Sequence, residues 1–160
     1  MVYGEEITAS EMSGRTGLDL LARMIYAEAE GESEMGKRGV ACVARNRKDH
    51  ASSSEFGGTT YKEVILHPNQ FSTVGTSRFL APDLNSTAWS DSLEIALNMD
   101  EVVNPISACL WFNTNSLYNN RSRVVNGQEQ YTFSTTNPNY KDVVEKHVLG
   151  NHTFFRLRGY

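Results

Sequence analysis

Residues 18–32, LDLLARMIYAEAEGE, predict one amphipathic helix that ends in a cluster of carboxylates. With a period of 3.6 residues, a single apolar stripe contains Leu18, Leu21, Ala22, Ile25 and Ala29. Glu28 falls at the edge of this stripe, whereas Glu30 points away from it toward solvent. Glu32 lies beyond Gly31, a residue that favours the end of a helix. The pattern therefore separates one acid, half in the core, from its two neighbours.

The position of Glu28 is typical of a general acid. Carboxyl groups that are partly buried beside like charges favour the protonated form. A protonated carboxyl near neutral pH is what acid-catalysed cleavage of a glycosidic bond requires. Acidic runs on helices are, however, more often solvated surface, so the pattern alone leaves a purely structural role open.

The composition is that of a single soluble domain. The chain has 160 residues, of which 39% are hydrophobic and 21% are charged. Its net charge of −4 argues against a nucleic-acid partner. No apolar run is long enough to span a membrane, and the first fourteen residues contain no signal-peptide pattern. The sequence thus leaves the location unknown and predicts no membrane span.

The cysteines and histidines predict neither a metal site nor a cofactor. Cys42 and Cys109 both lie in apolar surroundings, which favours buried free thiols over a single disulfide. The histidines form no HExxH pair, and the Cys/His spacing of a zinc site is missing. There is also no phosphate-binding glycine loop, dinucleotide fingerprint or GxSxG elbow.

Helical patterns fill the first two thirds of the chain. After Gly31, Ser33 can cap a second helix that runs to about residue 47 and carries a face of small residues. A short helical run follows Thr60, and a further capped helix is expected at residues 86–98. Residues 1–15 lack periodicity and are expected to be a loosely ordered lead-in.

The last third predicts strands. Residues 108–113 are apolar and aromatic, residues 118–127 form a polar loop, and residues 130–134 alternate weakly. Residues 147–156 are typical of a hairpin around a Gly-Asn turn. The expected fold is α+β, with helices first and a small antiparallel sheet toward the C-terminus. Residues 16–160 would then form a single catalytic domain.

Five separated blocks occur in an order that is characteristic of one family. They are LLARMIYAEAEGES at 20–33, GKRGVACVARNR at 36–47, YKEVILHPNQFS at 61–72, ACLWFNT at 108–114 and VLGNHTFF at 148–155. Together they resemble the cell-wall hydrolase family of spore cortex-lytic enzymes, the SleB/CwlJ type. The glutamate of the family's first block falls on Glu28. The chain departs from the family pattern at Ala27, Phe112 and Thr114, where glycine, tyrosine and proline are usual.

The resemblance implies a lysozyme-like peptidoglycan lytic transglycosylase that acts on the bacterial cell wall or the spore cortex. Such enzymes cleave the β-1,4 bond between N-acetylmuramic acid and N-acetylglucosamine and leave a 1,6-anhydro end. Glu28 would be the sole acid and base, because the sugar's own C6 hydroxyl replaces the second carboxylate of other glycosidases. The expected partners are glycan strands, and the expected state is a monomer without a cofactor.

Six further residues are candidates for substrate binding. Gln70 and Phe71 follow a proline and offer an amide beside an aromatic ring. Phe112 and Asn113 end the expected strand, where Phe112 would line the cleft and Asn113 would orient Glu28 or a sugar N-acetyl group. Each has a structural alternative: core packing for the phenylalanines, an exposed side chain for Gln70 and a turn for Asn113.

Tyr131 and His152 complete this set. Tyr131 lies in the aromatic segment QYTF and His152 follows the expected hairpin turn. Core packing for the tyrosine and a structural hydrogen bond for the histidine are the alternatives. Two other functions also stay open: a hydrolytic muramidase or glucosaminidase that uses water, and a non-catalytic cell-wall binding protein. The sequence does not distinguish a spore cortex, a vegetative wall or a phage lysis role.

Overall fold

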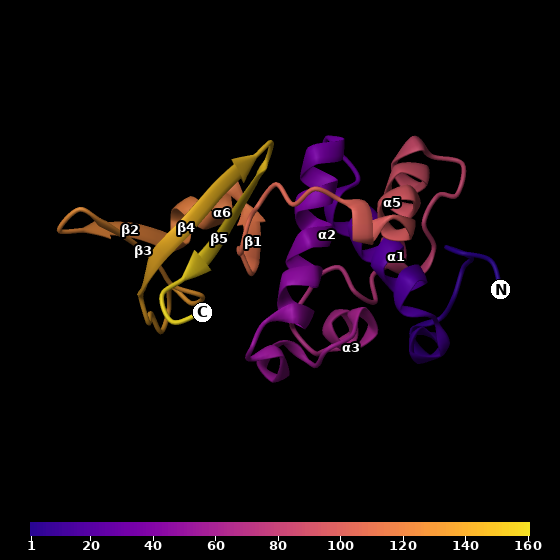
Figure 1. The fold of residues 1–160 in the computed structure, drawn as a ribbon, viewed down its shortest axis with the longest axis horizontal. Helices are drawn as coiled ribbons and strands as arrows, with labels where there is room; N and C mark the ends of the chain where they lie inside the picture. Colours follow the sequence, from indigo (N-terminus) through magenta and orange to yellow (C-terminus); the bar gives the residue numbers. More distant parts are fainter. The chain divides into compact units, whose positions relative to one another are not determined.

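The computed structural model describes residues 1–160, which form two compact units (Figure 1). The first unit, residues 1–105, is helical, and the second, residues 106–160, is built around a β-sheet. The expected order of helices followed by a small antiparallel sheet is confirmed. None of the helices combines the length and the apolar character that are needed to cross a membrane.

The helical unit is organised around α1 (Gly17–Ala29). This helix packs against α2, α3, α4 and α5, and ten of its thirteen residues are buried. It is therefore a central helix, more enclosed than the amphipathic stripe predicts. The surrounding helices are α2 (Glu34–Asp49), α3 (Tyr61–Leu66), α4 (Ser77–Leu80) and α5 (Thr87–Leu97), with short 3-10 turns η1 (Ala9–Gly14), η2 (Ser53–Phe56) and η3 (Met99–Glu101).

Hydroxyl side chains begin the main helices, as the sequence predicts. The Thr16 hydroxyl accepts a hydrogen bond from the Asp19 amide, and Ser33 accepts one from Gly36. Thr60 caps α3 in the same way. Each cap satisfies an amide that the first helical turn leaves unpaired, so these residues fix where each helix begins.

The first fifteen residues, for which the sequence predicts a loosely ordered lead-in, are bonded to the helices. The Gly4 amide donates to Asp19 Oδ1 at 2.7 Å, and Arg15 Nε donates to Asp19 Oδ2 at 2.8 Å. Arg23 Nη2 donates to the Glu5 carbonyl, and Ile7 is buried. A buried charge network thus ties this segment to α1, a tertiary contact that local periodicity does not reveal.

The second unit contains five antiparallel strands in the order β1-β5-β4-β3-β2. They are β1 (Trp111–Thr114), β2 (Ser122–Val125), β3 (Gln128–Tyr131), β4 (Lys141–Leu149) and β5 (His152–Leu157). The β4–β5 hairpin confirms the predicted turn, where Gly150 has a φ of 57°. The core of this unit is Tyr118, Tyr131, Phe155 and Leu157.

One segment of the second unit differs from its prediction. The polar loop expected at residues 118–127 is the end of α6 (Asn115–Arg121) followed by β2. The Thr114 hydroxyl caps α6 by accepting from the Leu117 amide, and Tyr118 is buried in the core. One buried aromatic ring therefore holds a helix whose other residues, apart from the exposed Leu117, are polar and resemble a loop sequence.

Candidate active site

Glu28 lies in the last turn of α1, and its side chain is half-buried. The Thr73 hydroxyl donates to Glu28 Oε1 at 2.9 Å, and the Thr73 amide donates to the same oxygen at 3.2 Å. Both hydrogen bonds reach Oε1, and Thr73 makes none to Oε2. The predicted position of Glu28 at the edge of the buried stripe agrees with this placement.

Arg47 on α2 holds the loop that carries Thr73. Its Nη1 donates to the Gln70 carbonyl at 3.0 Å and approaches Gln70 Oε1 at 3.4 Å. The guanidinium also lies over the rings of Phe71, at 4.6 Å, and Phe56, at 5.7 Å. The chain of contacts therefore runs from α2 through the loop to the carboxylate on α1.

Arg47 is an unusual cation because it is almost entirely buried. Burial lowers its pKa to about 9, while the negative charge of Glu28 acts in the opposite direction. The aromatic rings that it stacks against give the guanidinium a weakly polar but favourable environment. The buried Arg47 cation and the half-buried Glu28 carboxylate thus interact electrostatically.

The neighbouring acids have other partners. Glu30 forms an ion pair with Arg78 and accepts a hydrogen bond from the Tyr26 hydroxyl at 3.4 Å. It is half-buried, whereas the sequence predicts a side chain that points to solvent. Lys37 Nζ donates to the backbone carbonyls of Glu30, at 3.2 Å, and Glu32. These contacts cap the C-terminal end of α1 with a positive charge, beside Glu28.

Gln70 and Phe71 lie in the same loop as Thr73. Gln70 is half-buried and binds Arg47 through both its carbonyl and its side-chain oxygen. Phe71 is only 6% exposed, so its ring packs in the helical unit. The structure thus favours the core alternative for Phe71, and leaves Gln70 as the accessible residue of the two.

The other four candidates belong to the second unit. Trp111 and Phe112 point to opposite faces of the sheet, because Trp111 stacks on Phe155 whereas Phe112 packs against His152 with ring centroids 5.3 Å apart. Phe112 is half-buried and His152 is 7% exposed. This pair therefore packs on the face of the sheet that is opposite the core of the sheet unit.

Asn113 and Tyr131 form a second pair. Asn113 Nδ2 donates to the Tyr131 hydroxyl, which also accepts from Arg121 at 3.4 Å. The Tyr131 ring is completely buried in the core, so only its hydroxyl is available to a polar partner. The structure thus gives Tyr131 a supporting position and leaves Asn113, which is half-buried, as the more accessible member.

Sequence reasoning missed Thr73 and Arg47. Thr73 is three residues beyond Gln70, in a polar loop where nothing local identifies a partner for Glu28. Arg47 stands near the end of α2, where a basic side chain is ordinary for a helix. Both residues acquire their importance only from contacts with distant parts of the chain.

Comparisons with known proteins agree with this architecture. A family model described as Cell Wall Hydrolase matches residues 31–155, so the match begins three residues after Glu28. The catalytic domain of the Bacillus cereus SleB protein is 22% identical, with 88% of this chain and 89% of that chain covered at a TM-score of 0.54. The catalytic domain of the germination-specific lytic transglycosylase SleB from Bacillus anthracis is also 22% identical, with 89% and 98% covered at a TM-score of 0.55.

These solved structures confirm the predicted lysozyme-like α+β fold. The search of curated proteins gave no match. At this level of identity the structural likeness establishes the fold, and the roles of individual residues rest on the geometry described above.

Proposed function

Because this chain belongs to the Cell Wall Hydrolase family, we propose that it cleaves the glycan strands of peptidoglycan as a lytic transglycosylase. The bond is the β-1,4 linkage between N-acetylmuramic acid and N-acetylglucosamine, in a bacterial cell wall or spore cortex. The observation that carries this proposal is the Glu28 carboxyl, which is half-buried and bonded by Thr73 through one oxygen only. A carboxyl group that is held through one oxygen can exchange a proton with a substrate through the other oxygen.

The reaction needs one acid that works twice. Protonated Glu28 gives its proton to the glycosidic oxygen, and the bond from that oxygen to the muramic acid C1 breaks with the electron pair leaving on the oxygen. The resulting carboxylate then takes the proton of the C6 hydroxyl of the same sugar. As O6 bonds to C1, the 1,6-anhydro ring closes and Glu28 is again protonated. No water and no second carboxylate take part.

The contacts around Glu28 support this use of the side chain. Thr73 fixes Oε1, which leaves Oε2 to meet the glycosidic oxygen. In the helical unit, Gln70 is half-buried and would contact a sugar ring or an N-acetyl group. In the sheet unit, considered by itself, Phe112 and Asn113 are half-buried and stay predicted substrate contacts. Phe71, Tyr131 and His152 are buried and would act by positioning these neighbours. The activity named for the Bacillus anthracis protein, which has a similar fold, is consistent with this mechanism.

The test is the substitution Glu28→Gln, assayed by the release of soluble fragments from purified murein. The wild type should release fragments with 1,6-anhydromuramic ends, and the variant should release almost none. Fragments with reducing ends would instead show a muramidase or glucosaminidase that uses water. A wild-type protein that sediments with murein but releases nothing would be a cell-wall binding protein.

A further inference from the structure

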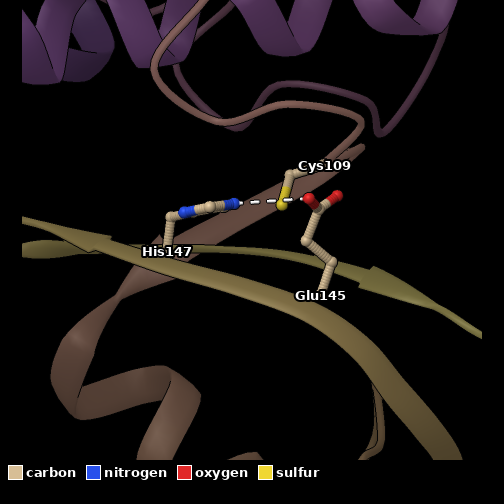
Figure 2. A group of neighbouring side chains, drawn as sticks. All are labelled: Cys109, Glu145 and His147. Atoms are coloured by element: carbon tan, nitrogen blue, oxygen red, sulfur yellow. Dashed lines mark hydrogen bonds and ion pairs between the residues drawn. The ribbon is translucent and has the colours of Figure 1, made fainter.

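Three side chains of the sheet unit converge on one point, although Cys109 is far from the other two in the sequence. Figure 2 shows the Cys109 thiol, the Glu145 carboxylate and the His147 imidazole directed toward one another. One ligand atom from each lies within 4.8 Å of the other two. His147 Nε2 is 3.4 Å from Glu145 Oε2. We propose that these three side chains bind a divalent transition-metal ion of the zinc type.

The backbone fixes all three positions. Glu145 and His147 are two residues apart on β4, so their side chains lie on the same face of the sheet. Cys109 lies two residues before the first residue of β1. The Cys109 amide donates to the Ile106 carbonyl and the Leu110 amide to the Phe155 carbonyl, each at 3.1 Å. The three groups therefore stand on paired strands and a bonded turn, a rigid support of the kind that metal sites need.

Glu145 is oriented by groups that bind its other oxygen. The Ala108 amide donates to Oε1 at 3.2 Å, and Arg156 Nε lies 3.5 Å from the same atom. Oε2 consequently faces His147. Hydrogen bonds that orient a ligating carboxylate are a regular part of metal sites.

The separation of the His147 and Glu145 ligand atoms fits a tetrahedral ion. Nitrogen and oxygen ligands bound at about 2.0 Å would be about 3.3 Å apart in tetrahedral geometry, close to the separation of His147 and Glu145. A thiolate, an imidazole and a carboxylate form a donor set for zinc or cobalt, whereas magnesium and calcium prefer oxygen alone. Three protein ligands leave the fourth position for water.

Cys109 is buried, and its sulfur lies near the Glu145 carboxylate and the His147 imidazole. A buried sulfur beside these two groups can complete a set of three protein ligands when an ion is present. A divalent cation would displace the thiol proton into solvent.

The two anionic ligands would match the charge of a divalent ion. A thiolate and a carboxylate together neutralise a divalent ion, and Arg156 adds one positive charge next to Glu145. Arg156 also donates to the Tyr160 carbonyl at 2.9 Å, which directs part of the guanidinium away from Glu145. This extra cation should weaken binding compared with a site that has only acidic neighbours.

The experiment titrates the chelator-treated full chain with Co²⁺, whose bond to a thiolate gives a charge-transfer band in the near ultraviolet. We expect one ion per chain, a thiolate band that Zn²⁺ removes by displacement, and a higher melting temperature with Zn²⁺. Cys109→Ser should abolish the band. His147→Gln, at a partly exposed position that tolerates polar side chains, should weaken binding at least about tenfold.

Cys42→Ser is the matched control, because Cys42 is also a buried free thiol but lies on α2 in the helical unit. It should leave the band and the stoichiometry unchanged. A wild type without a thiolate band, a band that survives in Cys109→Ser, or an equal loss in Cys42→Ser would each overturn the proposal. If Cys109→Ser does not fold, the affinity of His147→Gln decides, and unchanged binding in that variant refutes the site.

Discussion

Asp19 and Glu28 are two carboxylates at opposite ends of one helix, α1, and they are held in different ways. Asp19 is completely buried, and each of its oxygens is hydrogen bonded. Oδ1 accepts from the Gly4 amide, and Oδ2 accepts from Arg15 at 2.8 Å and Arg23 at 2.7 Å. Glu28 is half-buried and uses only Oε1.

This contrast distinguishes the structural role of Asp19 from the catalytic role that we propose for Glu28. Burial alone would raise the pKa of Asp19, but the hydrogen bonds from Arg15, Gly4 and Arg23 together lower it below its ordinary value. Asp19 therefore stays ionised at neutral pH and has no oxygen left for a substrate. Glu28 has a free oxygen, so depth of burial is a poorer guide to function than the number of hydrogen bonds that remain to be made.

The largest effect should come from Glu28→Gln. Loss of general acid catalysis should lower kcat for murein cleavage by about a thousandfold. The amide oxygen of glutamine can still accept from Thr73, so the free energy of unfolding should change by less than about 1 kcal/mol. Kinetics and urea unfolding of the same preparation test both statements. Near wild-type activity would refute the assignment of Glu28.

Asp19→Asn should show the opposite pattern. Removing the negative charge leaves the buried Arg23 without its carboxylate partner and leaves Arg15 with Glu5 alone, which should cost about 3–5 kcal/mol of unfolding free energy. The folded fraction should keep the wild-type kcat. Urea unfolding checks the first point, and Glu34→Gln, which breaks the exposed pair with Arg38, is a control that should cost less than about 1 kcal/mol. Equal costs in the two variants would contradict the structural role of Asp19.

The free energy of unfolding should depend on pH through the ionisation of Asp19. Since the pKa of Asp19 is lowered on folding, its contribution is complete above the unfolded pKa of about 4 and is lost as the pH falls toward the folded pKa. The difference in unfolding free energy between the wild type and Asp19→Asn should therefore be constant above about pH 5 and shrink below about pH 4. A difference that grows on acidification would contradict the lowered pKa.

The sequence predicts the burial of side chains at one end of α1 better than at the other. The helical period places Glu28 correctly because the C-terminal turn of α1 has an apolar and a polar side. It cannot identify Asp19 as buried, because the groups that compensate the charge come from Gly4 and from two arginines. The same reason explains why Thr73 and Arg47 were missed: their roles depend on the folded loop and not on spacing.

The second unit shows a similar limit. The β4–β5 hairpin follows from its turn residues, but α6 depends on one buried ring, Tyr118, within a polar stretch. The sequence also has no metal-binding spacing, because Cys109 meets Glu145 and His147 only through the pairing of β5 with both β1 and β4. Strand pairing between distant segments is not visible in local patterns.

A smaller effect is expected for Thr73→Val, which removes the hydroxyl that orients Glu28 and keeps its volume. The amide of residue 73 would still donate, so kcat should fall about tenfold, which corresponds to about 1.4 kcal/mol. Thr73→Ser retains the donor and is the control. Initial rates on murein separate the two variants, and equal rates would remove Thr73 from the site.

The smallest effect should follow from Glu30→Gln. Glu30 pairs with Arg78, whose side chain is 52% exposed, so the pair should contribute less than about 1 kcal/mol to stability. Murein cleavage should stay close to the wild-type rate, measured beside Glu28→Gln. A loss as large as that of Glu28→Gln would mean that the two acids act together.

Lys37 is a buried amine whose chemical modification can report local opening of the chain near Glu28. Its amine is enclosed because it donates to the backbone carbonyls of Glu30 and Glu32, and the side chain is buried. An amine-reactive reagent can modify it only when the turn between α1 and α2 opens. The rate at which Lys37 is modified would therefore report how often the turn next to Glu28 opens. Mass spectrometry of the peptide measures this rate, and the Glu28 carboxylate itself is not altered.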